Sequence, residues 1–159
     1  MQDEVELREV RPSDIPVFFE HHLEGMAERP ARGAADRLAQ RDRFEARWHG
    51  QLTDRAMTIR AILAGGRVAG YVAGFTQLGE PAIAYWLGRD FHGRGIATAA
   101  LLAFFERIPG RPVFARVAAD NLASLRVLAK CGFEECARAV HLSERRGCEV
   151  EEIVLVRHS

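Results

Sequence analysis

A short glycine-rich segment in the middle of the chain has the composition of an anion-binding turn. His92-Gly93-Arg94-Gly95-Ile96-Ala97 separates an apolar stretch that predicts a strand from one that predicts a helix. A helix that begins after such a turn presents unpaired backbone N–H groups at the positive end of its dipole. Glycine at positions 93 and 95 lets the backbone approach an anion closely. We therefore expect a phosphate or pyrophosphate here, with Arg94 and Arg89 adding positive charge.

Two nucleotide-binding motifs, the P-loop and the Rossmann motif, also place a glycine-rich turn before a helix. The P-loop is excluded because no Gly-Lys-Ser/Thr follows. The Rossmann pattern is closer, since Gly93-x-Gly95-x-x-Thr98 precedes a predicted helix, a strand and then Asp120, a possible ribose ligand. Against it, Thr98 replaces the third glycine, and the motif follows an antiparallel meander. Residues 121–159 are also too few for the remaining parallel units.

The elements before the turn are predicted from hydrophobic periodicity. A strand is expected near residues 5–10, and Ser13 is the expected N-cap of a helix over residues 15–23. A second helix is expected over 34–52, with one apolar face made of Leu38, Phe44, Trp48 and Leu52. The adjacent His21 and His22 are expected on a solvated helix face.

Three strands are expected next, over residues 56–63, 68–76 and 82–87, as an antiparallel meander. Gly65-Gly66 is typical of a type I′ hairpin turn. A second turn is expected at Gly79-Glu80-Pro81.

The remaining chain predicts alternating helices and strands. A helix is expected over 94–107, ended by Pro109-Gly110, followed by a strand over 113–119. Asn121 caps the next predicted helix and Gly132 ends it. Strands over 133–142 and 150–157 would form a final hairpin. The predicted order is β-α-α-β-β-β-α-β-α-β-β in a single domain over residues 1–159.

Two motifs, at residues 85–98 and 121–133, resemble the two characteristic motifs of the GNAT superfamily of N-acetyltransferases. Residues 85–98 resemble its acetyl-coenzyme A motif, Gln/Arg-x-x-Gly-x-Gly/Ala, which maps to His92-x-x-Gly95-x-Ala97. Residues 121–133 resemble its N-x-x-S-x-x-v-l-x-k-x-G-F signature, in the form found in ribosomal-protein N-terminal acetyltransferases. The opening from Leu7 to Asp14 also resembles that branch. The resemblance covers nearly the whole chain. It implies an α/β (α+β) GNAT fold, with a mostly antiparallel sheet of about seven strands and about four helices.

The resemblance also implies which residues bind acetyl-coenzyme A. The backbone of Trp86 and Leu87 would bind the pantetheine arm. The amides over the turn would bind the pyrophosphate, namely those of His92, Gly93, Arg94, Gly95, Ile96, Ala97 and Thr98. Asn121 and Ser124 match positions that face the pantetheine arm and the thioester. No metal is expected.

The sequence departs from the family at the catalytic positions. His92 stands where glutamine or arginine is usual, and Leu128 occupies the position that often holds a tyrosine acid. Ser124 or a bound water is the expected replacement for that acid. The strand residues 82–84, Ala-Ile-Ala, carry no base. Three residues elsewhere are candidates for it, or the base is an ordered water: Glu80, Glu144 and His141. Tyr85 and Trp86 are expected to pack in the sheet, although Tyr85 could orient a water.

The reaction implied is acetyl transfer from acetyl-coenzyme A to a primary amine, either a small molecule or a protein N-terminus. Glu20, Glu24 and Glu28 could line an acidic acceptor pocket or form a solvated helix edge. Two other classes stay open: a non-catalytic acyl-coenzyme A sensor and a Rossmann-type nucleotide binder.

Composition narrows the setting of this reaction. Zero formal net charge argues against a general nucleic-acid binder, and no apolar run is long enough for a membrane span. The three cysteines show no C-x-x-C spacing, which favours the cytoplasm. Homodimerisation is an expectation from the resemblance alone.

Overall fold

Seven strands form one mixed sheet in this computed structural model, which describes residues 4–25, 34–108, 112–143 and 147–158. The strand order is β1-β2-β3-β4-β5-β7-β6, and only β4 and β5 pair in parallel among the described strands. The strands are β1 (Val5–Glu9), β2 (Thr58–Ala64), β3 (Arg67–Gln77), β4 (Glu80–Leu87), β5 (Val113–Ala118), β6 (Glu134–Ser143) and β7 (Cys148–Arg157). This topology excludes the Rossmann alternative, which requires a mostly parallel sheet.

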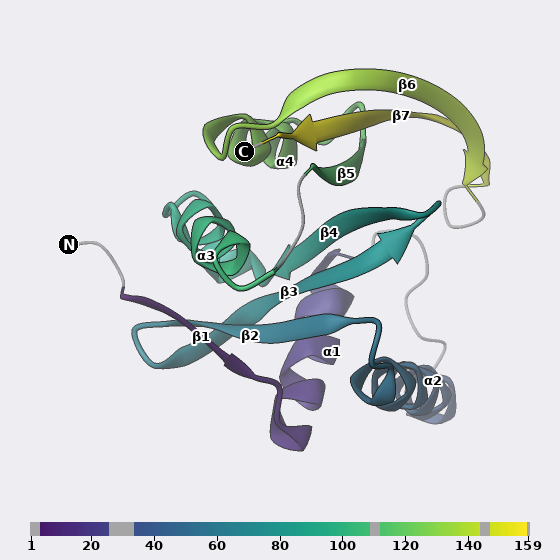
Figure 1. The fold of residues 1–159 in the computed structure, drawn as a ribbon. Coiled ribbons are helices and arrows are strands. Elements are labelled where there is room, and N and C mark those ends of the chain that lie inside the picture. The colour runs from purple at the N-terminus through teal and green to yellow at the C-terminus, as the bar shows by residue number, and fades with distance from the viewer. Residues whose placement is uncertain (1–3, 26–33, 109–111, 144–146, 159) are drawn as a thin grey trace.

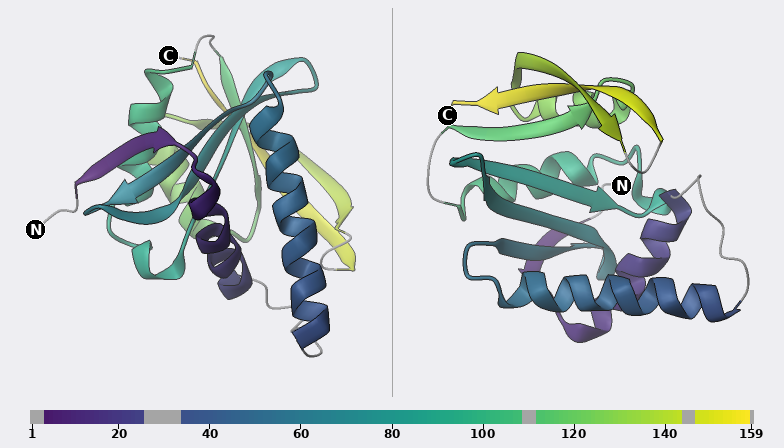
Figure 2. Two further views of the ribbon diagram at one scale, coloured as in Figure 1. Left: turned by 90° about the horizontal axis from the view of Figure 1, so that it is seen from below. Right: turned by 90° about the vertical axis from the view of Figure 1, so that its right-hand side faces the viewer.

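Helices cover both faces of the sheet, as Figures 1 and 2 show. One face carries α1 (Ile15–Gly25) and α2 (Ala34–Thr53), whose Phe18 and Trp48 are buried with β2 and β3. The other carries α3 (Ile96–Phe105) and α4 (Leu122–Lys130), whose Phe104 and Leu128 are buried with the central strands. The predicted order of elements is confirmed.

The helix α2 has a narrower apolar face than the sequence predicts. Phe44 and Trp48 are buried and pack against α1 and β3. Leu38 and Leu52, however, are 59% and 37% exposed. The predicted four-residue face is therefore wrong at both of its ends, where α2 extends past the elements that bury its middle.

The start of α1 is stabilised by an ion pair and not by the predicted Ser13 cap. Residues Pro12–Asp14 form a 3₁₀ turn, and the Asp14 carboxylate accepts the backbone N–H of Arg11 at 2.7 Å. The same carboxylate accepts two bonds from the Arg8 guanidinium at 2.6 and 2.9 Å. Asp14 is 2% exposed, and these bonds hold its pKa below the usual value although burial alone would raise it. This buried pair fixes β1 to the start of α1.

The two hairpin turns of the meander differ in how well they were predicted. Gly65 and Gly66 both have positive φ, 58° and 82°, as the predicted type I′ turn requires. The second turn is instead made by Leu78 and Gly79, with φ of 53° and 79°. Glu80 therefore already pairs with Gln77 in the ladder, and β4 begins two residues earlier than expected.

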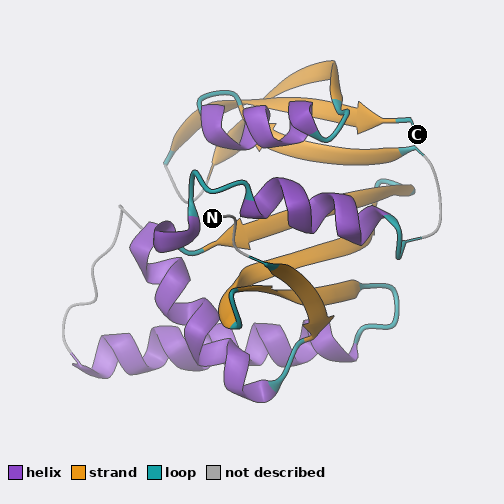
Figure 3. Cartoon of the chain, turned by 90° about the vertical axis from the view of Figure 1, so that its left-hand side faces the viewer, coloured by secondary structure: helices purple, strands orange, loops and turns teal. Residues whose placement is uncertain are grey.

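The sheet opens between β4 and β5. Their ladder consists of the single parallel pair Ala82↔Phe114, so the two strands diverge toward their carboxyl ends. Figure 3 shows α4 beside the β5-β7-β6 group and α3 along the junction with the other four strands. Residues at the carboxyl end of β4 therefore lie at an opening in the sheet.

Candidate active site

The glycine turn after β4 has the geometry of an anion-binding cradle. A 3₁₀ turn, Arg89–Phe91, leads into it, and α3 begins at Ile96 with Gly95 as its N-cap. Gly95 has a left-handed φ of +77°, and its position carries no side-chain cap. A Cβ placed on Gly95 would meet no atom within 4 Å. A side chain at this position would therefore project into open space at the start of α3.

A cavity of about 440 Å³ lies directly in front of this turn. Its walls come from the end of β4, the turn, the start of α3 and one side of α4. Of the residues predicted to bind the cofactor, the walls include Trp86, Leu87, His92, Gly93, Gly95, Ile96, Ala97, Thr98, Asn121 and Ser124. Arg94 is not among the wall residues, and its guanidinium, expected to add charge, bonds the Asp90 carbonyl at 3.3 Å and lies over Phe91.

Two cations in the cavity wall were missed by the sequence reasoning. Arg126 and Lys130 stand four residues apart on α4 and both line the cavity. Side chains at i and i+4 lie on the same side of a helix, so both face the same space. That spacing, next to the recognised Asn121 motif, is the signal that could have identified them.

The His92 side chain contacts the end of the strand that precedes the turn. Its Nε2 lies 3.0 Å from the carbonyl oxygen of Leu87, the last residue of β4. The imidazole therefore braces the turn against the strand end. This explains how histidine can replace the usual glutamine or arginine, since the backbone amides remain available for an anion.

A tyrosine and a serine meet at the inner end of the cavity. The hydroxyl groups of Tyr85 on β4 and Ser124 on α4 are 3.0 Å apart. The backbone N–H of Ser124 donates to the Asn121 side chain at 3.2 Å, which fixes the position of Ser124. The same bond confirms the prediction that Asn121 caps α4. Burial raises the pKa of Tyr85, with the Ser124 bond opposing that effect. The phenol therefore remains protonated at neutral pH and can donate a proton.

The Tyr85–Ser124 pair supplies a candidate for the acid that the sequence lacks at its expected position. That position, four residues before Gly132, is Leu128, which is buried in the core. The structure brings a tyrosine to the same helix from β4 instead. Tyr85, expected mainly to pack in the sheet, thus lies beside the predicted acid Ser124.

Of the two glutamates named as candidate bases, the structure describes Glu80, and it does not bring Glu80 to the cavity. Glu80 is exposed at the first residue of β4, five residues before Tyr85, or about 17 Å along an extended strand. That position argues against Glu80 as the base. Glu144 lies outside the described residues. His141 is described, on β6, where its Nε2 lies 3.3 Å from a carboxylate oxygen of Glu152.

The prediction that His21 and His22 lie on a solvated face is wrong. The His22 ring packs against Phe44 and Trp86, with centroids 5.4 and 5.6 Å away. The His21 ring lies so close to Gly88 that a Cβ there would be 2.6 Å from it. Both rings therefore fill the contact between α1 and the end of β4.

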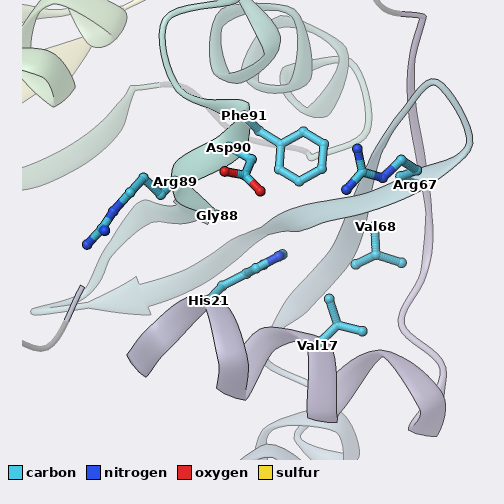
Figure 4. A pocket seen from close by; sticks show the side chains of 8 residues that line it. All are labelled: Val17, His21, Arg67, Val68, Gly88, Arg89, Asp90 and Phe91. Atoms are coloured by element: carbon cyan, nitrogen blue, oxygen red, sulfur yellow. The ribbon is translucent and has the colours of Figure 1, made fainter. Parts of the chain in front are cut away.

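A second cavity, of about 340 Å³, lies on the α1 side of the 3₁₀ turn. Figure 4 shows its wall, with His21 reaching from α1 toward Gly88 and Asp90. Arg67, from the start of β3, lies over the Phe91 ring at 5.2 Å from its centroid. This cavity does not include the Tyr85–Ser124 pair.

Within the part of the chain that the structure describes, no group of three or more His, Cys, Asp or Glu side chains could hold a metal ion. No helix in the same residues combines the length and the apolar character that a membrane crossing requires.

Comparison with known proteins identifies related sequences and folds. The family model described as acetyltransferase (GNAT) domain matches residues 4–134. No curated protein matches the sequence.

Solved structures with similar folds include three described with coenzyme A or acetyl-coenzyme A. RimL, a ribosomal L7/L12 α-N-protein acetyltransferase in complex with coenzyme A, is 19% identical with a TM-score of 0.80, over 97% of this chain and 93% of that one. Mycobacterium smegmatis RimJ, in complex with a coenzyme A disulfide, is 22% identical with a TM-score of 0.76, over 98% and 82%. The microcin C7 self-immunity acetyltransferase MccE, in complex with acetyl-coenzyme A and AMP, is 16% identical with a TM-score of 0.76, over 99% and 94%. At these identities the likeness establishes a common fold.

Proposed function

This chain belongs to the acetyltransferase (GNAT) family, and from that premise we propose that it moves an acetyl group from acetyl-coenzyme A to a primary amine by direct attack. The observation that carries the proposal is one cavity that joins a left-handed glycine cradle to a protonated tyrosine. The cradle suits a pyrophosphate, and the tyrosine suits a leaving thiolate.

The cofactor would bind along the cavity in an extended form. Its pyrophosphate would accept hydrogen bonds from the backbone of residues 93–98, at the start of α3. Arg126 and Lys130 add two cations on the α4 side for the phosphates. The pantetheine arm would follow the exposed backbone of Trp86 and Leu87, where β4 has separated from β5. This path ends beside Asn121 and Ser124.

The thioester would then lie close to the Tyr85–Ser124 pair. A neutral amine attacks the acetyl carbonyl, a C–N bond forms, and the C–S bond breaks. The departing thiolate takes the Tyr85 proton, and the phenolate recovers a proton from the new amide nitrogen through Ser124. Burial favours the neutral phenol, so Tyr85 is charged only briefly.

The sensor hypothesis loses its basis in this arrangement. It depended on the absence of a tyrosine at position 128, and Tyr85 supplies the missing phenol from β4. An enzyme is therefore the better interpretation of the site.

The setting of the reaction is also a proposal. We expect a single domain over residues 1–159 that works in the cytoplasm. Free thiols at Cys131, Cys136 and Cys148 support a reducing compartment. A homodimer is the expected assembly, and light scattering of the purified protein would test it.

The test is a panel of amines and peptides incubated with acetyl-coenzyme A while free thiol is followed. We expect thiol release with at least one amine, and saturable binding of acetyl-coenzyme A by calorimetry. NAD is the control ligand and should not bind. Failure of acetyl-coenzyme A to bind would refute the proposal.

A further inference from the structure

A mixed-charge cluster lies at the centre of the β5-β7-β6 group. One carboxylate oxygen of Glu152 on β7 accepts from the Arg116 guanidinium on β5 at 3.3 Å. Its other oxygen lies 3.3 Å from Nε2 of His141 on β6. The Glu152 side chain is 22% exposed, while that of His141 is 48% exposed. The cluster is therefore anchored in the sheet and still open to a solute.

The register of the sheet places this cluster at the level of the opening. β4 and β5 pair at Ala82↔Phe114, and four residues further along each strand stand Trp86 and Ala118. Ala118 pairs with Glu152 on the far side of β5. Glu152 is thus on the strand behind β5, opposite the end of β4 where the thioester is proposed to lie.

The same register assigns the faces. Side chains alternate along a strand, and paired residues point to the same face. Arg116, Glu152 and Trp86 therefore share a face, and Trp86 packs against His22 of α1. Tyr85 points to the opposite face, where it meets Ser124 of α4. The cluster is on the α1 side of the opening, and the proposed cofactor path is on the α4 side.

An unsatisfied donor on this face also indicates a ligand. The indole Nε1 of Trp86 is buried and has no hydrogen-bond partner within the described residues. Buried N–H groups in native proteins are nearly always paired. A polar group of a bound molecule on the α1 side would satisfy it.

We propose that Arg116, Glu152 and His141 form the site that receives the acceptor, and that the acceptor is an aliphatic primary amine bound as its ammonium ion. This inference rests on the proposed acetyl transfer. Glu152 binds the ammonium group, and Arg116 acts as a positioning residue that fixes one carboxylate oxygen. His141 takes the proton, because histidine is the side-chain type that exchanges protons near neutral pH.

The protons balance in this scheme. The ammonium ion gives one proton to the His141 imidazole, which passes it to solvent. The neutral nitrogen then forms the C–N bond as the C–S bond breaks. Its second proton reaches the coenzyme A sulfur through Ser124 and Tyr85. The products are the N-acetylated amine, coenzyme A and one proton.

Glu152 on β7 contacts His141, and Arg116 on β5 contacts Glu152 from the other side. A chemical change at Glu152 should therefore alter the pH profile that His141 imposes. The neighbouring residue offers a matched control. Glu151 is also paired with an arginine, Arg138, but on the opposite face of β7.

The experiment compares Glu152→Gln, His141→Gln and Glu151→Gln in the full-length protein with benzylamine, spermidine and aniline as acceptors. Benzylamine and spermidine are ammonium ions at neutral pH, whereas aniline is already neutral. We expect the first two variants to lower kcat/KM for the alkylamines by about 100-fold, the usual size of a proton-transfer contribution. They should change any aniline rate by less than about threefold and remove the acid limb of the alkylamine pH profile. Glu151→Gln should match the wild type.

Calorimetry with acetyl-coenzyme A and thermal melting separate the possible failures. All three variants should bind the cofactor and melt close to the wild type, because these ion pairs are partly exposed and glutamine keeps a side chain that can form hydrogen bonds. Equal alkylamine kinetics in Glu152→Gln and Glu151→Gln would overturn the inference. So would cofactor binding with no acetylation of any alkylamine, in which case the cofactor site itself would stand. Absence of acetyl-coenzyme A binding in the wild type would instead refute the proposed function.

Discussion

Replacing Gly95 by aspartate is the sharpest test of the anion-binding turn. Gly95 holds a φ of +77° at the N-cap of α3, and a Cβ on it would meet nothing within 4 Å. The new carboxylate would project into the space proposed for the pyrophosphate. We expect affinity for acetyl-coenzyme A to fall steeply.

The magnitude follows from two separate effects. A carboxylate about 5 Å from a phosphate charge is repelled by about 3 kcal/mol at an effective dielectric constant of about 20. That energy corresponds to a loss of affinity of about 100-fold. The left-handed backbone costs a non-glycine residue about 1–2 kcal/mol, which lowers folding stability and not binding.

Two control variants separate these effects. Gly95→Asn has nearly the same shape as aspartate without the charge, so it should retain most of the affinity. Gly66→Asp places the same residue at a φ of +82° in the hairpin turn, again with no atom within 4 Å of its Cβ. It should reproduce the stability loss and leave binding intact. Calorimetry measures affinity, and thermal melting measures stability. Equal affinities for Gly95→Asp and Gly95→Asn would refute the electrostatic argument.

The other predictions concern the proton donor, the buried ion pair and alkaline pH. Tyr85→Phe should slow thiol release by about 100-fold with acetyl-coenzyme A affinity unchanged. Combined with Ser124→Ala it should show a non-additive loss in a double-mutant cycle, whereas purely additive losses would argue against a shared role. Asp14→Asn should destabilise the fold by about 3 kcal/mol in urea denaturation, because it leaves a part-buried arginine without its counter-ion. Ser13→Ala should be nearly neutral, and an equal loss in both variants would contradict the role assigned to the Arg8–Asp14 ion pair. Burial raises the pKa of Tyr71, as it does for Tyr85, so the folded state disfavours both phenolates. The contribution of these two phenols to the unfolding free energy should therefore be constant from neutral pH to about pH 10 and fall above it, as denaturation across that range would show.

Much of the cofactor side could be predicted because its signals are local. The glycine turn at 93–95 and the cap at Asn121 each depend on residues a few positions apart. Because the anion is proposed to bind backbone amides, the identity of the neighbouring side chains matters little for this prediction. The same locality explains why the order of strands and helices was predicted correctly.

The proton-transfer groups were harder to predict because they depend on distant contacts. Tyr85 and Ser124 are 39 residues apart in the sequence and meet only when β4 packs against α4. Glu152 gains its importance from the face that it shares with Arg116, which depends on the register of β5 and β7. A periodic pattern shows that residues share a face but does not show what that face meets.

Predictions from residue type alone were wrong where tertiary contacts outweighed the local preference. His21 and His22 have a polar composition typical of a solvated face, yet aromatic rings and the bare backbone of Gly88 surround them. At the start of the same helix, Ser13 is a good N-cap residue by type. At this point of the fold it is instead the Asp14 carboxylate that accepts the backbone N–H of Arg11 and the guanidinium of Arg8 on β1.

The separation of β4 from β5 after a single residue pair has a consequence for the order of kinetic events. We expect the end of β4 to be reached from both faces of the sheet, with the donor on the α4 side and the acceptor on the α1 side. Donor and acceptor can then occupy the protein together, and neither has to leave before the other enters. Initial-rate plots at several fixed amine concentrations should intersect and not run parallel, and free coenzyme A should compete with the donor alone.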